Sequence, residues 1–131
     1  MREQPSAGEL IEAVAEFLQR DIAPQLSGRT AFHARVAFNV LQIVRRELAQ
    51  GPDADRAEAG RLAAILGRDG EADALNEALC QQIANGEIAA DDPALVEHLW
   101  ATTLGVVAVD QPNYATYRRE SAAAENQPGD A

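Results

Sequence analysis

The sequence predicts an all-α protein, a bundle of about five helices. Apolar residues recur with helical spacing along almost all of the 131 residues, and no alternating run or hairpin signal typical of strands is present. The short connections between these segments favour antiparallel neighbouring helices. We expect a single domain over residues 6–118, a flexible N-terminus over residues 1–5 and a disordered acidic tail over residues 119–131.

The first helix is expected over residues 7–20. Ser6 and Glu9 have the spacing of a capping box, in which each side chain bonds the backbone of the other residue. Pro24 and the Ser27-Gly28 pair should end the helix. Its apolar stripe is made of Leu10, Ile11, Val14, Phe17 and Leu18.

The second helix, over residues 29–50, has an apolar face that covers about half of the helical wheel, which is typical of a helix with several neighbours. Gly51-Pro52 should end it, because glycine is a common C-cap and proline supplies no amide. The face expected in the core comprises Phe32, Val36, Ala37, Val40, Leu41, Ile43, Val44 and Leu48.

Three further helices complete the expected bundle. The third runs over residues 53–66 and stops at Gly67, and the fourth starts near Glu71 and ends before Gly86. The fifth runs over residues 93–109, with Asp92 as N-cap and Pro93 in the first turn.

Charge and composition exclude several classes of function. The formal net charge of −10 argues against nucleic acid and against an anionic membrane surface as partners. All 11 basic residues are arginine, so mechanisms that need a lysine, such as Schiff-base formation, are excluded. Because the chain has one cysteine, no apolar leader and no long apolar run, we expect a cytoplasmic protein.

No catalytic constellation is evident, so we expect a protein that is not an enzyme and uses neither a metal nor a cofactor. Ser27 lacks the glycines of a nucleophile elbow, and Cys80, next to an apolar stripe, fits a buried structural cysteine. Asp91 and Asp92 are adjacent and point apart on a helix, and a capping role explains Asp92.

One candidate ligand site lies at the start of the second helix. Gly28 would let backbone amides approach a ligand, and Arg29 and His33 lie one turn apart on the same side. These three residues could bind an anion. Alternatively, His33, which falls within the apolar arc, is a neutral core histidine bonded to a backbone carbonyl or a carboxylate.

One candidate partner surface lies on the other side of the same helix. Residues 28–46 hold four arginines and no acid, so the rest of the chain carries −14, which is −10 minus +4. This ridge is either a solvated face with salt bridges or a contact surface with an aromatic anchor and an arginine rim. Its residues are Arg35, Phe38, Asn39, Gln42 and Arg46.

The segment from Leu26 to Asn39, LSGRTAFHARVAFN, resembles a bacterial family of helical domains of unknown function. The segments PSAGEL from Pro5 and VDQPNY from Val109 are similar to two weaker signatures of that family. Its members are encoded beside, or fused to, aminoglycoside-phosphotransferase-like kinases and near acyl-CoA dehydrogenases. The resemblance therefore implies an accessory role with such a protein as partner, and no catalytic residue.

Two functions thus stay open at the level of the sequence. The first is a non-enzymatic module that binds a protein partner through the ridge around Phe38. The second is a module that binds an anionic or acyl-CoA-like metabolite through Arg29 and His33. Homo-oligomers are compatible with both, because the apolar arcs of the second and fifth helices are wider than one small bundle needs to cover.

Overall fold

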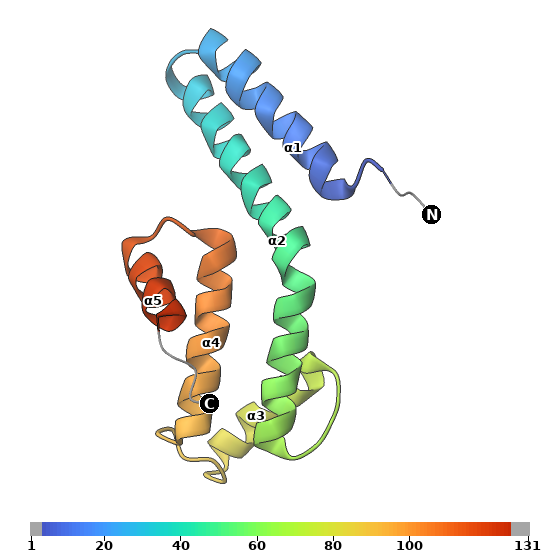
Figure 1. The fold of residues 1–131 in the computed structure, drawn as a ribbon, viewed down its shortest axis with the longest axis vertical. Helices are drawn as coiled ribbons and strands as arrows, with labels where there is room; N and C mark the ends of the chain where they lie inside the picture. Colours follow the sequence, from blue (N-terminus) through green and yellow to red (C-terminus); the bar gives the residue numbers. More distant parts are fainter. Residues whose placement is uncertain (1–3, 127–131) are drawn as a thin grey trace. The chain divides into compact units, whose positions relative to one another are not determined.

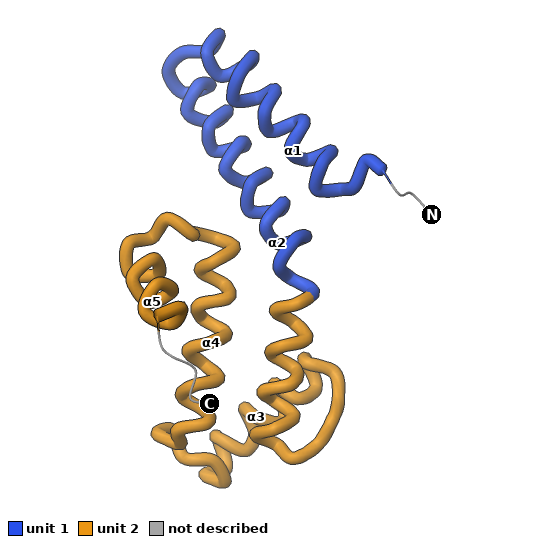
Figure 2. Tube along the Cα trace, viewed as in Figure 1, with its two compact units in different colours: residues 1–52 blue, residues 53–131 orange. Residues whose placement is uncertain are grey.

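The protein is all-α in the computed structural model, which describes residues 4–126 (Figure 1). Within that range the chain forms five α-helices and no strand, which confirms the fold class. The chain divides into two compact units, residues 1–52 and residues 53–131 (Figure 2). The single domain expected over residues 6–118 stays a prediction. None of the helices in the described range is both long enough and apolar enough to cross a membrane.

Unit 1 is a hairpin formed by α1, Ala7–Phe17, and the first part of α2, Gly28–Leu66. The capping box is confirmed, since the Ser6 amide donates to the Glu9 carboxylate at 2.7 Å and the Ser6 hydroxyl accepts from the Glu9 amide at 3.2 Å. A π-helical turn, Leu18–Ile22, and a 3-10 turn, Ala23–Gln25, lead from α1 to α2, which runs back antiparallel to α1 (Figure 1).

The break expected at Gly51-Pro52 is wrong, because α2 is one continuous helix of 39 residues that passes through Pro52. Gly51 does not adopt the positive φ that ends a helix at a C-cap glycine, whereas Gly67 and Gly86 do, with φ of +68° and +76°. Proline removes one helical hydrogen bond, and the helix-forming residues on both sides sustain the helix across that gap.

The orientation expected for the second helix is also wrong in large part. Gln42 and Arg45 of α2 bond to Glu12 of α1, so this side of α2 faces α1. The buried Ala31 and the half-buried Phe38, which was expected outside, lie on the same side of the helix. Leu41 and Ile43 of the expected core face are half-buried. The expected core residues Phe32, Val36, Val40, Val44 and Leu48 are instead 40–55 % exposed.

Unit 2 contains the end of α2 together with α3, Ala72–Ala84, α4, Pro93–Asp110, and α5, Ala115–Glu125. Asp92 caps α4 as expected, since its carboxylate accepts from the amides of the second and third helical residues at 3.0 and 3.2 Å. The core consists of Leu62, Leu75, Leu79 and Leu95, with Ile65, Leu66, Ile83 and Ile88 packed against it.

The C-terminal segment corrects the expected extent of the tail. Residues 119–125 were expected to be disordered on account of their polar composition, but they belong to α5. Arginine, glutamate and the run Ala122–Ala124 are strong helix formers, and this local preference decides the conformation. Residues 127–131 of the expected tail and residues 1–3 of the expected flexible N-terminus lie outside the described residues.

Candidate functional site

The polar interactions of unit 1 centre on Glu12 of α1. The Arg45 Nε–H lies 3.0 Å from the Glu12 carboxylate and 3.0 Å from the Gln42 amide oxygen, and the Gln42 amide donates to Glu12 at 3.3 Å. These three side chains join α1 to α2 on one side of the hairpin. Arg45, an arginine of the basic segment that does not belong to the expected ridge, is therefore paired inside the unit.

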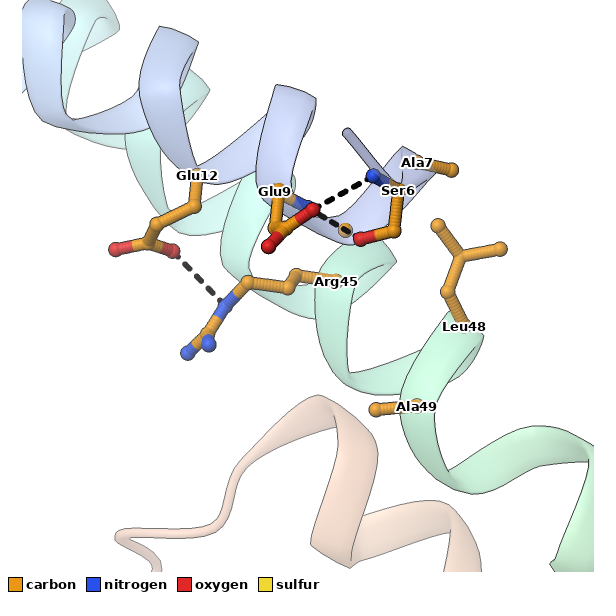
Figure 3. Close-up of a pocket in the computed structure, with 8 residues that line it drawn as sticks. Ser6, Ala7, Glu9, Glu12, Arg45, Leu48 and Ala49 are labelled. Atoms are coloured by element: carbon orange, nitrogen blue, oxygen red, sulfur yellow. Dashed lines mark hydrogen bonds and ion pairs between the residues drawn. The ribbon is translucent and has the colours of Figure 1, made fainter. Parts of the chain in front are cut away.

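A pocket of about 560 Å³ lies beside this pair, between the start of α1 and the middle of α2 (Figure 3). The Arg45 and Glu12 side chains face each other along it, and the capping box of Ser6 and Glu9 closes one end. Leu48 contributes an apolar wall. The pocket offers mixed polar and apolar contacts, but its charged groups already pair with each other, which weakens its attraction for a charged ligand.

A second pocket, of about 280 Å³, coincides with the candidate partner surface. Arg35, Phe38 and Asn39 line it together with Gln19, Ala23 and Ala34. Phe38 lines the pocket as a half-buried side chain, which corrects the exposed position expected for it from the helical wheel. Arg35 is exposed and forms no ion pair or hydrogen bond with the described residues 4–126.

The other two residues of the expected ridge do not line this pocket. Gln42 is half-buried and bonded to Glu12 and Arg45. Arg46 is half-buried and has a partner of its own. The structure therefore narrows the candidate surface to Arg35, Phe38 and Asn39.

The candidate anion-binding residues meet at the start of α2. Gly28 has a φ of +60°, and the Arg29 Nε–H donates to His33 Nε2 at 3.2 Å. His33 is exposed and packs edge-on against Phe32, with ring centroids 5.7 Å apart. The alternative interpretation of His33 as a buried core histidine is therefore wrong, because the side of α2 that holds His33 is exposed. None of the three pockets described here is lined by His33.

The buried histidine of the described chain is His98, which sequence analysis overlooked. It lies on α4 in unit 2, only 2 % exposed, and its Nδ1 accepts from the Arg61 Nε–H at 3.3 Å. Arg61 also donates to the Thr102 hydroxyl at 3.2 Å. One arginine of α2 thereby holds two polar residues of α4. The sequence did hold a sign that His98 is buried: Leu95, His98 and Thr102 have helical spacing and lie on one side of α4.

Burial lowers the pKa of His98 below its ordinary value of 6.5, and the positive charge of Arg61 lowers it further. The nearby carboxylate of Glu58, which accepts from the Asn76 amide at 3.1 Å, acts in the opposite direction. The imidazole is therefore neutral at pH 7 and serves as an acceptor. This arrangement links α2 to α4, and no pocket described here reaches His98.

Acidification is expected to destabilise unit 2 through His98. Between pH 6.5 and the lower folded-state pKa, the unfolded chain binds a proton at His98 that the folded chain excludes. The free energy of unfolding therefore falls as the pH decreases below 6.5. Urea unfolding across this range measures the slope. H98Q should show a shallower slope than the wild type; equal slopes for H98Q and the wild type would contradict the assignment.

Three further features of the described residues bear on catalysis or metal binding: the cysteine, an acidic pocket and the grouping of possible metal ligands. Cys80, expected to be buried, is exposed on α3, because Leu75 and Leu79 form the buried stripe of that helix. A third pocket, of about 510 Å³, is lined by the acidic residues Asp55, Glu58, Glu71 and Asp73 together with Arg56 and uncharged residues. Across residues 4–126, no group of three or more histidine, cysteine, aspartate or glutamate side chains is placed to hold a metal ion.

Comparison with known proteins identifies one family. Neither a curated protein nor a solved structure matches the chain. A domain of unknown function, DUF6285, matches residues 24–114, which is more than half of the chain. The match includes the segment Leu26–Asn39 on which the resemblance to a family of unknown function rests, and it covers residues 24–52 of unit 1 and most of unit 2. The chain therefore belongs to the DUF6285 family.

Proposed function

We propose that this chain is a non-enzymatic accessory domain that binds a protein partner through the pocket of Arg35, Phe38 and Asn39. The observation that carries the proposal is the combination, in one concave site, of an exposed arginine without a partner in the described chain, a half-buried aromatic ring and an amide. Arginine and aromatic side chains are the residues most enriched in protein interfaces.

The chemistry of the pocket favours an acidic side chain on the partner. A guanidinium binds a carboxylate through two parallel hydrogen bonds, which fix its orientation as well as its position. The Phe38 ring and the methyl groups of Ala23 and Ala34 would contact the apolar stem of that side chain. A glutamate or aspartate next to an apolar residue therefore fits the site.

The first partner to test is the aminoglycoside-phosphotransferase-like kinase that the family resemblance implies. The acyl-CoA dehydrogenase-like neighbour is the second. In either case the chain would act as a binding subunit or domain, because its described residues supply no evident nucleophile with a base and no metal cluster.

Charge reversal in the pocket is expected to weaken partner binding. R35E should lower the affinity for the co-expressed kinase by about tenfold or more, because it replaces the guanidinium by a carboxylate that repels an acidic partner. R68E is the matched control, since Arg68 is also exposed and lies in the other unit. Titration calorimetry on purified proteins measures both. Failure of the wild type to bind, or equal binding by both variants, would overturn the proposal.

A second candidate function is the binding of an anionic or acyl-CoA-like metabolite at Gly28, Arg29 and His33. It is favoured by the 3.2 Å bond that brings Arg29 and His33 together at the start of α2. Thermal-shift measurements with acyl-CoAs and phosphorylated metabolites distinguish it from partner binding. Stabilisation that is lost in R29A and H33A would support this candidate, and stabilisation that persists would exclude these residues.

A further inference from the structure

The hairpin of unit 1 carries large apolar side chains that the unit does not cover. Within the described part of unit 1, the buried hydrophobic residues are Ala15 and Ala31, and larger side chains such as Ile11, Leu18 and Leu41 are only half-buried. Eight large residues are instead 40–55 % exposed. We call six of them the apolar hairpin face: Leu10, Val14 and Phe17 of α1, and Val40, Val44 and Leu48 of α2.

These six residues lie on one side of the hairpin. Each residue advances about 100° around the helix axis. Viewed down the axis of α1, its three residues lie about 100–160° from the buried Ala15, and in α2 the three residues lie about 80–160° from the half-buried Phe38, in the same direction of rotation along the chain. Because α1 and α2 run antiparallel, the same direction of rotation in both helices places these residues on the same side of the hairpin (Figure 1).

The apolar hairpin face has one charged residue at its edge, Glu47, which lies about 20° from Val40 on the helical wheel. Of the other ionisable residues within residues 10–17 and 40–48, Glu12 and Arg45 lie at the contact between the helices, where they form an ion pair. Glu16 and Arg46 point to the opposite side. The rest of the face can meet an identical copy of itself without placing like charges together, which a self-complementary interface requires.

The area of this face suits a dimer. Its six residues expose on the order of 550 Å² per copy, so that two copies could bury up to about 1,100 Å², close to the approximately 1,000 Å² that a biological interface needs. A hairpin in which only two alanines are fully buried gains from such cover, because large apolar side chains contribute most of the free energy of burial.

We propose that a second copy of this chain docks on the apolar hairpin face, and that the two hairpins are related by a two-fold axis. The interface is isologous, so each copy contributes the same six residues. Arg35 lies on the opposite side of the hairpin, so the pocket proposed to bind a partner stays accessible in the dimer. Dimer formation and partner binding can therefore be tested independently.

The test uses sedimentation velocity of the full chain over a concentration series. The wild type is expected to sediment at twice the mass of the chain. V14D should raise the dissociation constant of the dimer by about 100-fold or more, because two carboxylates enter the apolar contact. V106D is the matched control, since Val14 and Val106 are 53 % and 55 % exposed and both lie on α-helices. Circular dichroism reports whether each variant stays folded.

Cysteine cross-linking locates the interface without relying on a destabilising change. In the C80S background, V14C is expected to give a covalent dimer with a short bismaleimide. The control E16C, two residues along the same helix but on the opposite side, is expected to give none. A monomeric wild type, a dimer that V106D disrupts and V14D does not, or equal cross-linking of both cysteines would each overturn the proposal. R35E should leave the mass unchanged.

Discussion

Replacing Leu62 by alanine is expected to lower the free energy of unfolding by about 2–5 kcal/mol, the range measured for leucine residues in well-packed cores. Leu62 is fully buried at the end of α2 and packs with Leu75, Leu79 and Leu95, one or two residues from each neighbouring helix. Its truncation removes apolar contacts and leaves a cavity that the surrounding helices fill only in part.

The control for this substitution is L99A. Leu99 lies on α4 in the same unit but is 50 % exposed, so its truncation loses less buried surface and creates no enclosed cavity. Both variants are compared by urea unfolding followed by far-ultraviolet circular dichroism. A loss for L62A no larger than that for L99A would show that this cluster is not the core of unit 2.

Replacing Arg61 by methionine is expected to cost about 1–3 kcal/mol, although the position is only half-buried. The apolar stem is kept, but His98 Nδ1 loses the donor that lies 3.3 Å away, and His98 is 2 % exposed. An acceptor buried without a donor costs more than the bond itself contributes, because water that satisfied it in the unfolded chain is lost.

A double-mutant cycle separates this bond from other effects of Arg61. If the bond to His98 carries the cost, R61M should destabilise the H98F variant much less than it destabilises the wild type. R68M serves as the control for removal of an exposed arginine and should change the free energy of unfolding by less than about 0.5 kcal/mol. Equal costs of R61M in both backgrounds would exclude the proposed link between α2 and α4.

The helix ends of this chain could be predicted from the sequence because they depend on local bonds. Ser6 with Glu9 and Asp92 with Pro93 specify their caps through atoms within three residues, and the structure has both. Gly67 and Gly86 end their helices through a backbone conformation that glycine adopts without steric cost. Gly51 has the same side chain but helical dihedral angles, so residue type alone did not show which glycine ends a helix.

The faces of α2 could not be predicted in the same way. The wheel ranks residues by hydrophobicity, whereas α1 packs on the side that holds Ala31, Gln42 and Arg45. That choice involves an ion pair between Glu12 and Arg45, which are 33 residues apart in the sequence. The more apolar side, with Val40 and Val44, stays exposed within unit 1.

The candidate pocket could be predicted from the sequence only in part, namely for the residues that share one helix. Arg35, Phe38 and Asn39 lie within four residues of one another on one helix, so their proximity follows from helical spacing. Gln19 and Ala23 join them only through the turn between α1 and α2. The bond between Arg61 and His98 joins residues 37 positions apart, which no local pattern could indicate.

Pro52 has a consequence for how α2 is built. Helix growth adds one backbone hydrogen bond per residue, and a proline interrupts that propagation because it has no amide to donate. The proline separates a segment of 24 residues, 28–51, from one of 15 residues, 52–66. Both reach the approximately 12–15 residues at which a helix can begin to persist in water. The two segments can therefore nucleate separately, each beside the helices of its own unit, and join into one helix as the chain folds.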